Sequence, residues 1–271
     1  MAEITAKMVN DLRGKTGLGM MECKKALTEC AGDVEKAIEY FRKKGVKASV
    51  MERSASEGRV AVAISADRKH GVIVEINCTT DFAAKSETVG KIAAMAAEKL
   101  LANPAMKLAD DAAIKDQLIS VSQQTGENVI IGRTATLSST SGVVGSYVYT
   151  VAGKGKSAVL MSFGGKVDED VIRNVGMHIV AARPLAMTRG EVSPELVAKE
   201  KEIAVEQAKA TGKPQEIAEK IALGKLNSFY AERVLMDQEY INGEVFKGSV
   251  ANFLKSKSAT LEKYIRIEVG Q

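Results

Sequence analysis

The stretch Gly71-Val-Ile-Val-Glu-Ile-Asn-Cys-Thr-Thr-Asp-Phe-Ala-Ala-Lys85 joins two different hydrophobic patterns. Its first half alternates between apolar and other residues closely enough to predict a half-buried strand. Farther along, apolar residues recur at helical spacing between Val89 and Leu100. The end of the stretch is therefore predicted to be a corner between a strand and a helix, with Asp81 and Phe82 side by side at its tip.

The pattern at this corner has two interpretations. In the first, Thr80 or Asp81 caps the following helix and Phe82 folds back into the core as a plug. In the second, Phe82 stays exposed and contacts another protein. The pattern alone favours the first, because capped corners are common and a single Phe after one is usually buried.

Two separate stretches of the chain resemble hallmarks of one family. Glu75-Ile-Asn-Cys-x-Thr-Asp-Phe-x-Ala-Lys85 resembles the second hallmark of the elongation factor Ts family, and Leu12-Arg-x-x-Thr-Gly-x-Gly-Met-Met-x-Cys-Lys-Lys-Ala-Leu27 resembles the first. Two long matches in the right order are much more specific than either alone, and the similarity runs from Ala2 to about Gly270. In the second hallmark, Thr79 replaces the usual Gln or Glu and Ala83 the usual Val.

The resemblance implies a guanine-nucleotide exchange factor that binds elongation factor Tu, both with GDP and without nucleotide. It assigns the contact with the partner's Mg²⁺ and phosphate site to Thr80, Asp81, Phe82 and Ala83. Phe82 would act as an apolar wedge, and Asp81 would compete for groups that order the Mg²⁺ and phosphate. The expected result is release of GDP so that GTP can bind.

Residues 1–46 are predicted to form three short helices, a bundle with a thin core whose spare apolar groups indicate a docking surface. In the family, such a UBA-like module grips the nucleotide domain of elongation factor Tu, which implies contacts by Met20, Met21 and Lys24. Simpler alternatives stay open, since Met20 precedes Cys23 by three residues and could be core, and Lys24 could belong to a solvated face.

The remaining pattern predicts an α+β fold with a doubled core of β-hairpins and helices, because a hairpin followed by a helix occurs twice. The expected units after the bundle are a linker at 47–58, a first core subdomain at 59–138, a second at 139–184 and 234–271, and an inserted antiparallel helical hairpin at 185–233. This hairpin is predicted to be a coiled coil with a seam of mostly small residues, and self-association through it is left open. The predicted seam is Val197, Ala204, Ala208, Ile217, Ile221, Gly224 and Ser228.

One further candidate lies in the second core subdomain. The family often carries a His in the strand that follows Gly145-Ser-Tyr147, and Tyr149 occupies that position here. Tyr149 is therefore a candidate contact with the partner.

Composition excludes several functional classes. The 271 residues are 45% hydrophobic, enough to bury a sizeable core. No apolar run approaches the ~18 residues of a membrane span, and no secretory pattern opens the chain, so we expect a cytoplasmic protein without membrane contact. Three cysteines form a poor disulfide framework, which agrees with that compartment.

The sequence offers little for catalysis or cofactor binding. Its only histidines are His70, expected in a loop, and His178, expected in the core, and no spacing suits a catalytic or metal site, so we expect no enzyme and no cofactor. Gly153-Lys-Gly-Lys-Ser157 lacks the first glycine of a phosphate loop and is better explained as a tight hairpin turn. A net charge of +4 and the absence of Trp argue against direct nucleic-acid binding. The alternative function is a non-catalytic RNA- or ribosome-associated protein.

Overall fold

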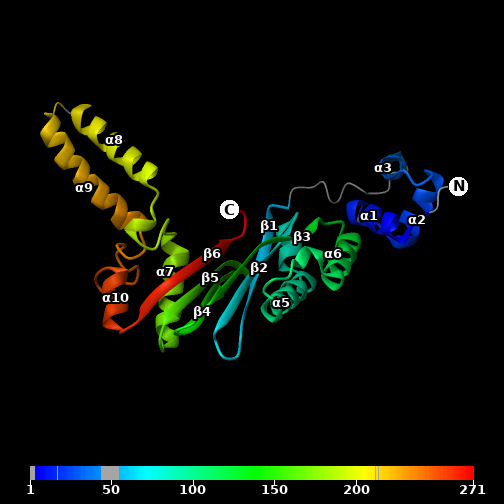
Figure 1. Ribbon diagram of the computed structural model, residues 1–271, viewed down its shortest axis with the longest axis horizontal. Helices are drawn as coiled ribbons and strands as arrows, with labels where there is room; N and C mark the ends of the chain where they lie inside the picture. Colours follow the sequence, from blue (N-terminus) through cyan, green and yellow to red (C-terminus); the bar gives the residue numbers. More distant parts are fainter. Residues whose placement is uncertain (1–3, 17, 44–54, 211, 213) are drawn as a thin grey trace.

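The computed structural model describes residues 4–16, 18–43, 55–210, 212 and 214–271. Within them the fold is mixed α+β, with N-terminal helices, two three-stranded antiparallel sheets and a pair of long helices (Figure 1). Most of the predicted linker, 47–54, lies outside the described residues. Its last two residues, Glu57 and Gly58, already belong to the first strand.

The N-terminal helices lie at the opposite end of the molecule from the long helix pair (Figure 1). They are α1 (Ala6–Thr16), α2 (Met20–Glu29) and α3 (Val34–Lys43). Asp33 caps α3 as its sequence position suggests, because its carboxylate accepts a hydrogen bond of 3.1 Å from the Lys36 amide. The buried side chains of this small unit are Val9, Leu12, Cys23, Ala26, Leu27, Ala37 and Phe41.

Each sheet consists of a β-hairpin and a third strand that pairs with the hairpin's second strand. The strands are β1 (Glu57–Ile64), β2 (His70–Cys78), β3 (Val129–Ser138), β4 (Val143–Val151), β5 (Lys154–Gly164) and β6 (Thr260–Glu268). The orders are β1-β2-β3 and β4-β5-β6, so a hairpin's second strand is central in both. The loop position predicted for His70 is wrong, because pairing with Ser138 makes it the first residue of β2.

The two sheets pack face to face because successive side chains along each strand point to opposite faces of its sheet. Ile73 of β2 and Leu160 of β5 share the cluster between the sheets, whereas their neighbours Val74 and Val159 face the helices outside. The approach is close at Gly71 of β2, where a Cβ would lie 2.8 Å from the Val144 side chain of β4 and 3.0 Å from that of Leu160 of β5. Any larger residue there would push the sheets apart.

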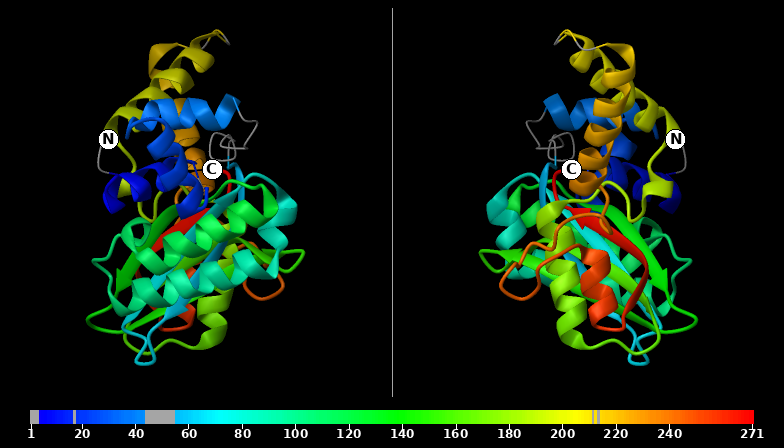
Figure 2. Two further views of the ribbon diagram at one scale, coloured as in Figure 1. Left: turned by 90° about the vertical axis from the view of Figure 1, so that its right-hand side faces the viewer. Right: turned by 90° about the vertical axis from the view of Figure 1, so that its left-hand side faces the viewer.

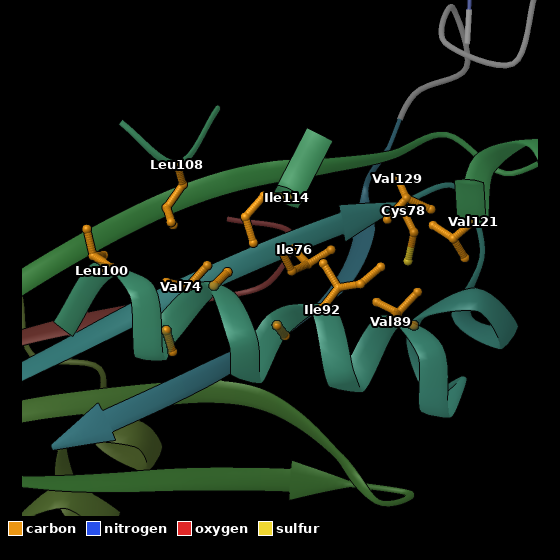
Figure 3. Packing of buried hydrophobic residues seen from close by; sticks show 14 of the residues in the cluster. Val74, Ile76, Cys78, Val89, Ile92, Leu100, Leu108, Ile114, Val121 and Val129 are labelled. Carbon is orange, nitrogen blue, oxygen red and sulfur yellow. The ribbon is translucent and has the colours of Figure 1, made fainter. Parts of the chain in front are cut away.

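Helices cover the outer faces of both sheets. The first sheet is covered by α4 (Asp81–Lys85), α5 (Glu87–Ala102) and α6 (Ala112–Thr125), and the second by α7 (Glu169–Ala182) and α10 (Val250–Ser256). Figure 3 shows Val74, Ile76 and Cys78 of β2 facing Val89 and Ile92 of α5. The predicted helix from Val89 to Leu100 is thus confirmed, and its apolar stripe forms this core.

The long helices α8 (Pro194–Ala210) and α9 (Gln215–Arg233) extend away from the sheets in both views of Figure 2. The chain enters and leaves the pair at one place, where the Leu185 amide donates to the Arg233 carbonyl over 2.8 Å. The predicted seam is correct at Ala204 and Ala208, and Val197 and Ile221 are half-buried, but it is wrong at the other three positions, all in α9. There Ile217, Gly224 and Ser228 are exposed, and the buried residues are Ala218 and Ala222. Alanines four residues apart allow closer packing than the larger Ile217 would, so the seam is shifted by one residue.

Candidate partner-binding site

The corner between β2 and α4 is built around Thr80. Its hydroxyl accepts a hydrogen bond of 3.2 Å from the Ala83 amide, so Thr80 caps α4 and Asp81 is the first helical residue. Of the two caps that the sequence suggested, Thr80 is therefore correct. The thiol of Cys78 donates to the Thr80 carbonyl over 3.3 Å. Burial raises the pKa of Cys78 to about 11, which keeps this donor protonated.

Glu127, between α6 and β3, holds the corner from the other side. Its carboxylate accepts hydrogen bonds from both the amide of Thr80 (3.1 Å) and its hydroxyl (2.7 Å). The hydroxyl of Thr79 adds a third tie by accepting from the Asn128 amide over 3.0 Å. Charge-assisted hydrogen bonds of this kind are stronger than neutral ones, so the capping residue is fixed to the body of the first sheet.

Phe82 points away from the protein. Its side chain is 86% exposed, whereas the following residues Ala83 and Ala84 are buried against the core under the helix. The plug interpretation is therefore wrong. The two alanines take the inward positions of this short helix, and the residue before them is left on the outer side.

Asp81 is held by two lysines. The Nζ of Lys85, one turn later in the same helix, lies 2.6 Å from one carboxylate oxygen. The Nζ of Lys154, from the second sheet, donates to the other oxygen. The Asp81 side chain stays 45% exposed, while that of Lys154 is only 4% exposed. Asp81 thus links an exposed corner to a buried cation.

Lys154 reaches Asp81 because the turn before it is very short. Ala152 and Gly153 form the whole connection between β4 and β5, both with positive φ (49° and 79°), as a two-residue hairpin turn requires. The segment from Lys154 to Ser157 is strand, so the turn is narrower than predicted. At Gly155 a Cβ would lie 2.5 Å from the Val60 carbonyl oxygen, and this close approach brings the hairpin against β1.

Arg59 of β1 also contacts the corner helices, because its Nη1 lies 3.4 Å from the Ala84 carbonyl and 3.5 Å from that of Ser86. Glu127, Lys154 and Arg59 were all missed by sequence reasoning. They are 25 to 73 residues away from the groups they contact, and no local pattern connects such positions.

The other candidate residues lie on separate elements. Met20 and Met21 on α2 are 52% and 76% exposed, so the core alternative for Met20 is wrong, and Lys24 on the same helix is also exposed. Tyr149 lies on β4, is 46% exposed and lines a hollow of about 500 Å³ together with Arg183.

Glu75, the first residue of the second hallmark, has a structural role. It is buried and accepts from Arg133 over 2.8 and 3.1 Å, while the same guanidinium donates to the Glu268 carbonyl over 2.5 Å. Burial alone would raise the pKa of Glu75, but the hydrogen bonds and charge of Arg133 outweigh it and lower the pKa. The ionised pair lies within the first sheet, and the Arg133 bond to the Glu268 carbonyl of β6 connects it to the second.

His178 is a core residue, as predicted. Its Nδ1 accepts from the Ile241 amide (3.2 Å), so Nε2 carries the proton and donates to the Gln238 side chain (3.0 Å). Burial lowers the pKa of His178 and keeps it neutral. Across the part of the chain that the structure describes, no cluster of three or more His, Cys, Asp or Glu could hold a metal ion. No helix there is long and apolar enough to span a bilayer.

Comparison with known proteins agrees with the hallmarks. The sequence model of a family described as elongation factor TS matches residues 79–271. The elongation factor Ts of Hyphomonas neptunium is 40% identical over 284 residues, which cover 100% of this chain and 93% of the relative. That of Chloroherpeton thalassium is 40% identical over 98% of this chain and 96% of the relative, and that of Chlorobaculum parvum is 38% identical over the full length of both. The chain therefore belongs to the elongation factor Ts family, the nucleotide-exchange factors of elongation factor Tu.

Proposed function

We propose that the corner of Thr80, Asp81, Phe82 and Ala83 enters elongation factor Tu and disturbs the Mg²⁺ and phosphate site that holds GDP. As a family member, the protein promotes nucleotide exchange and performs no catalytic chemistry of its own. The observation that carries the proposal is the 86% exposure of Phe82 on a corner whose neighbouring residues are anchored.

In this proposal the four residues have different tasks. Phe82 is the wedge, because an exposed phenyl ring gains about 2–3 kcal/mol when a partner buries it. Asp81 presents the exposed part of its carboxylate to the groups that order the Mg²⁺ and phosphate. Thr80 caps the helix, and Ala83, only 8% exposed, packs in the core of the first sheet and offers the partner little side-chain surface.

The mechanism requires no bond to be broken. A corner that binds the nucleotide-free partner better than the GDP-bound one lowers the affinity for GDP. Linkage then requires that bound nucleotide weakens this protein's own binding by the same factor. GTP can therefore expel the protein after GDP has left.

We further propose that residues 1–46 dock on the nucleotide domain of elongation factor Tu through Met20, Met21 and Lys24. Exposed methionines on a small helical unit support this, because flexible thioether side chains adapt to irregular surfaces. Tyr149 is proposed as a contact from the second sheet, supported by its exposure beside a hollow.

The proposed layout has two repeated core units, 59–138 and 139–184 with 234–271, and an insertion at 185–233. The matching strand orders of the two sheets support the repeat, and the hydrogen bond between Leu185 and Arg233 supports the insertion. Exposed Ile203 and Leu223 on the helix pair support self-association through it. We place the protein in the cytoplasm, where translation elongation takes place.

The test is release of a fluorescent GDP analogue from elongation factor Tu. The protein should accelerate release at substoichiometric amounts, and Phe82→Ala should remove most of this acceleration while the protein stays folded. Full acceleration by a folded Phe82→Ala variant would reject the wedge. Salt-sensitive RNA binding without accelerated release would instead favour the alternative function.

A further inference from the structure

We infer that Lys154 is a positioning residue for nucleotide exchange, which reaches from the second sheet to hold Asp81 and thereby aims Phe82. The inference rests on the proposed function of the corner. It adds a residue from the other half of the core, 73 positions away in sequence, to the group of residues on which exchange depends.

Lys154 is in an unusual environment for a lysine. Its side chain is 4% exposed, and lysine is almost never buried unless it is paired. The acidic groups facing its Nζ are the Asp81 carboxylate, to which it donates, and the Glu57 carboxylate at 3.6 Å. The buried ammonium therefore depends mainly on Asp81 for compensation of its charge.

Helix α4 cannot fix its own direction. It has five residues, far fewer than a helix needs for stability in water without tertiary contacts. Phe82 projects into solvent, so its direction is determined by the anchors of the residues on either side of it. After Phe82, the anchors are the buried alanines and the Arg59 contact with the Ala84 carbonyl. Before it, Glu127 holds Thr80 to the first sheet, and Asp81 adds the contact with the second sheet.

The two lysines that pair with Asp81 are not equivalent. Lys85 belongs to the same helix and moves with it, so its ion pair cannot hold the helix against the body. Lys154 belongs to β5, and among the residues that the structure describes its bond is the one that ties the Asp81 carboxylate to the second sheet. Replacing a buried ion pair by apolar groups is often neutral for stability, which leaves positioning as the role for this pair.

The experiment is a double-mutant cycle on the full chain, with wild type, Asp81→Ala, Lys154→Met and the double variant. We measure the maximal rate of fluorescent-GDP release and the concentration of the partner complex that gives half that rate. Lys154→Met should lower the maximal rate about tenfold, the effect of losing one charge-assisted hydrogen bond. The half-saturating concentration should change less than about twofold, because the rest of the interface is unaltered. In the Asp81→Ala background, Lys154→Met should have no further effect.

Lys166→Met is the matched control, because it removes the same charge from an exposed position just beyond the other end of β5. It should exchange like wild type. Should Lys154→Met fail to fold, Lys154→Arg takes its place in the cycle. It keeps the charge but displaces the carboxylate, and we expect a loss of about threefold that again disappears in the Asp81→Ala background.

Equal losses in both backgrounds would overturn the inference, because Lys154 would then not act through Asp81. No loss from Lys154→Met, with Phe82→Ala still slow, would also overturn it and leave the proposed function standing. Normal exchange by Phe82→Ala would remove the proposed function itself, so the two failures are distinguishable.

Discussion

Phe82→Ala should separate binding from stability more cleanly than any other single change in this chain. Burying a whole Phe side chain is worth about 1.5–3 kcal/mol, and only about one seventh of this ring is covered, so the lost burial is roughly 0.3 kcal/mol. Alanine is the better helix former by roughly 0.5 kcal/mol, which offsets that loss. We therefore expect the melting temperature to stay within about 1 °C of wild type.

The effect on exchange should be much larger. If elongation factor Tu buries the ring, its removal forfeits about 2–3 kcal/mol of interaction, or about 30- to 150-fold in the rate constant for stimulated GDP release. Release of fluorescent GDP and a thermal melt on the same preparation measure both quantities.

Phe163→Ala is the control for sensitivity, because Phe163 is fully buried in the second sheet. Its truncation should cost about 3–5 kcal/mol and lower the melting temperature by roughly 10 °C. If Phe82→Ala melts as early as Phe163→Ala, the ring is packed against the protein and the exposure argument is wrong. A wild-type exchange rate in a stable Phe82→Ala protein would refute the wedge.

Three further predictions concern other parts of the structure. Asp81→Ala should lower the free energy of unfolding in urea by about 1–3 kcal/mol, because it leaves Lys154 buried beside Glu57 alone. Adding Lys154→Met should restore part of that free energy. A wild-type urea midpoint for Asp81→Ala would contradict the burial of this pair. Replacing residues 201–224 by a short Gly/Ser linker should leave a folded protein that still exchanges nucleotide, since the apolar cluster around Val192 and Val234 at the base of the helix pair remains. Global unfolding of this variant would show that the core needs the helix pair in order to fold. The pKa of Cys78 is raised from 9.0 to about 11, so folding stability should fall as pH rises from 9 to 11, because the unfolded chain releases this proton first. Cys78→Ala should flatten this dependence of the unfolding free energy on pH. An equal dependence in the variant would show that other groups cause it.

Helices, strands and caps could be predicted from the sequence because each depends on residues that are close together in the chain. The alternation before Glu75 predicted β2, and the spacing between Val89 and Leu100 predicted α5. Capping is equally local: Ser249 caps α10 by accepting from the Asn252 amide, three residues later, over 3.3 Å. Backbone preferences and capping act over a few residues, so such patterns are sufficient to predict these elements.

The seam of the helix pair could not be predicted from local patterns alone. The spacing predicted that two helices pack together, but nearly every turn of α9 offers a small or apolar residue. Which side faces α8 depends on the closest approach of the two backbones. That approach selected Ala218 and Ala222 and left Ile217 exposed.

The tip of the corner depends even more on tertiary contacts. Five residues are too few to define an apolar face, so the pattern could not decide whether Phe82 is a plug or a wedge, and it favoured the wrong one. The deciding contacts are made by Glu127, 47 residues after Thr80, and by Lys154, 73 residues after Asp81. Sequence spacing cannot predict such contacts. The pairing of β3 with β2 brings Glu127 to the corner, and the packing of the second sheet against the first brings Lys154 there.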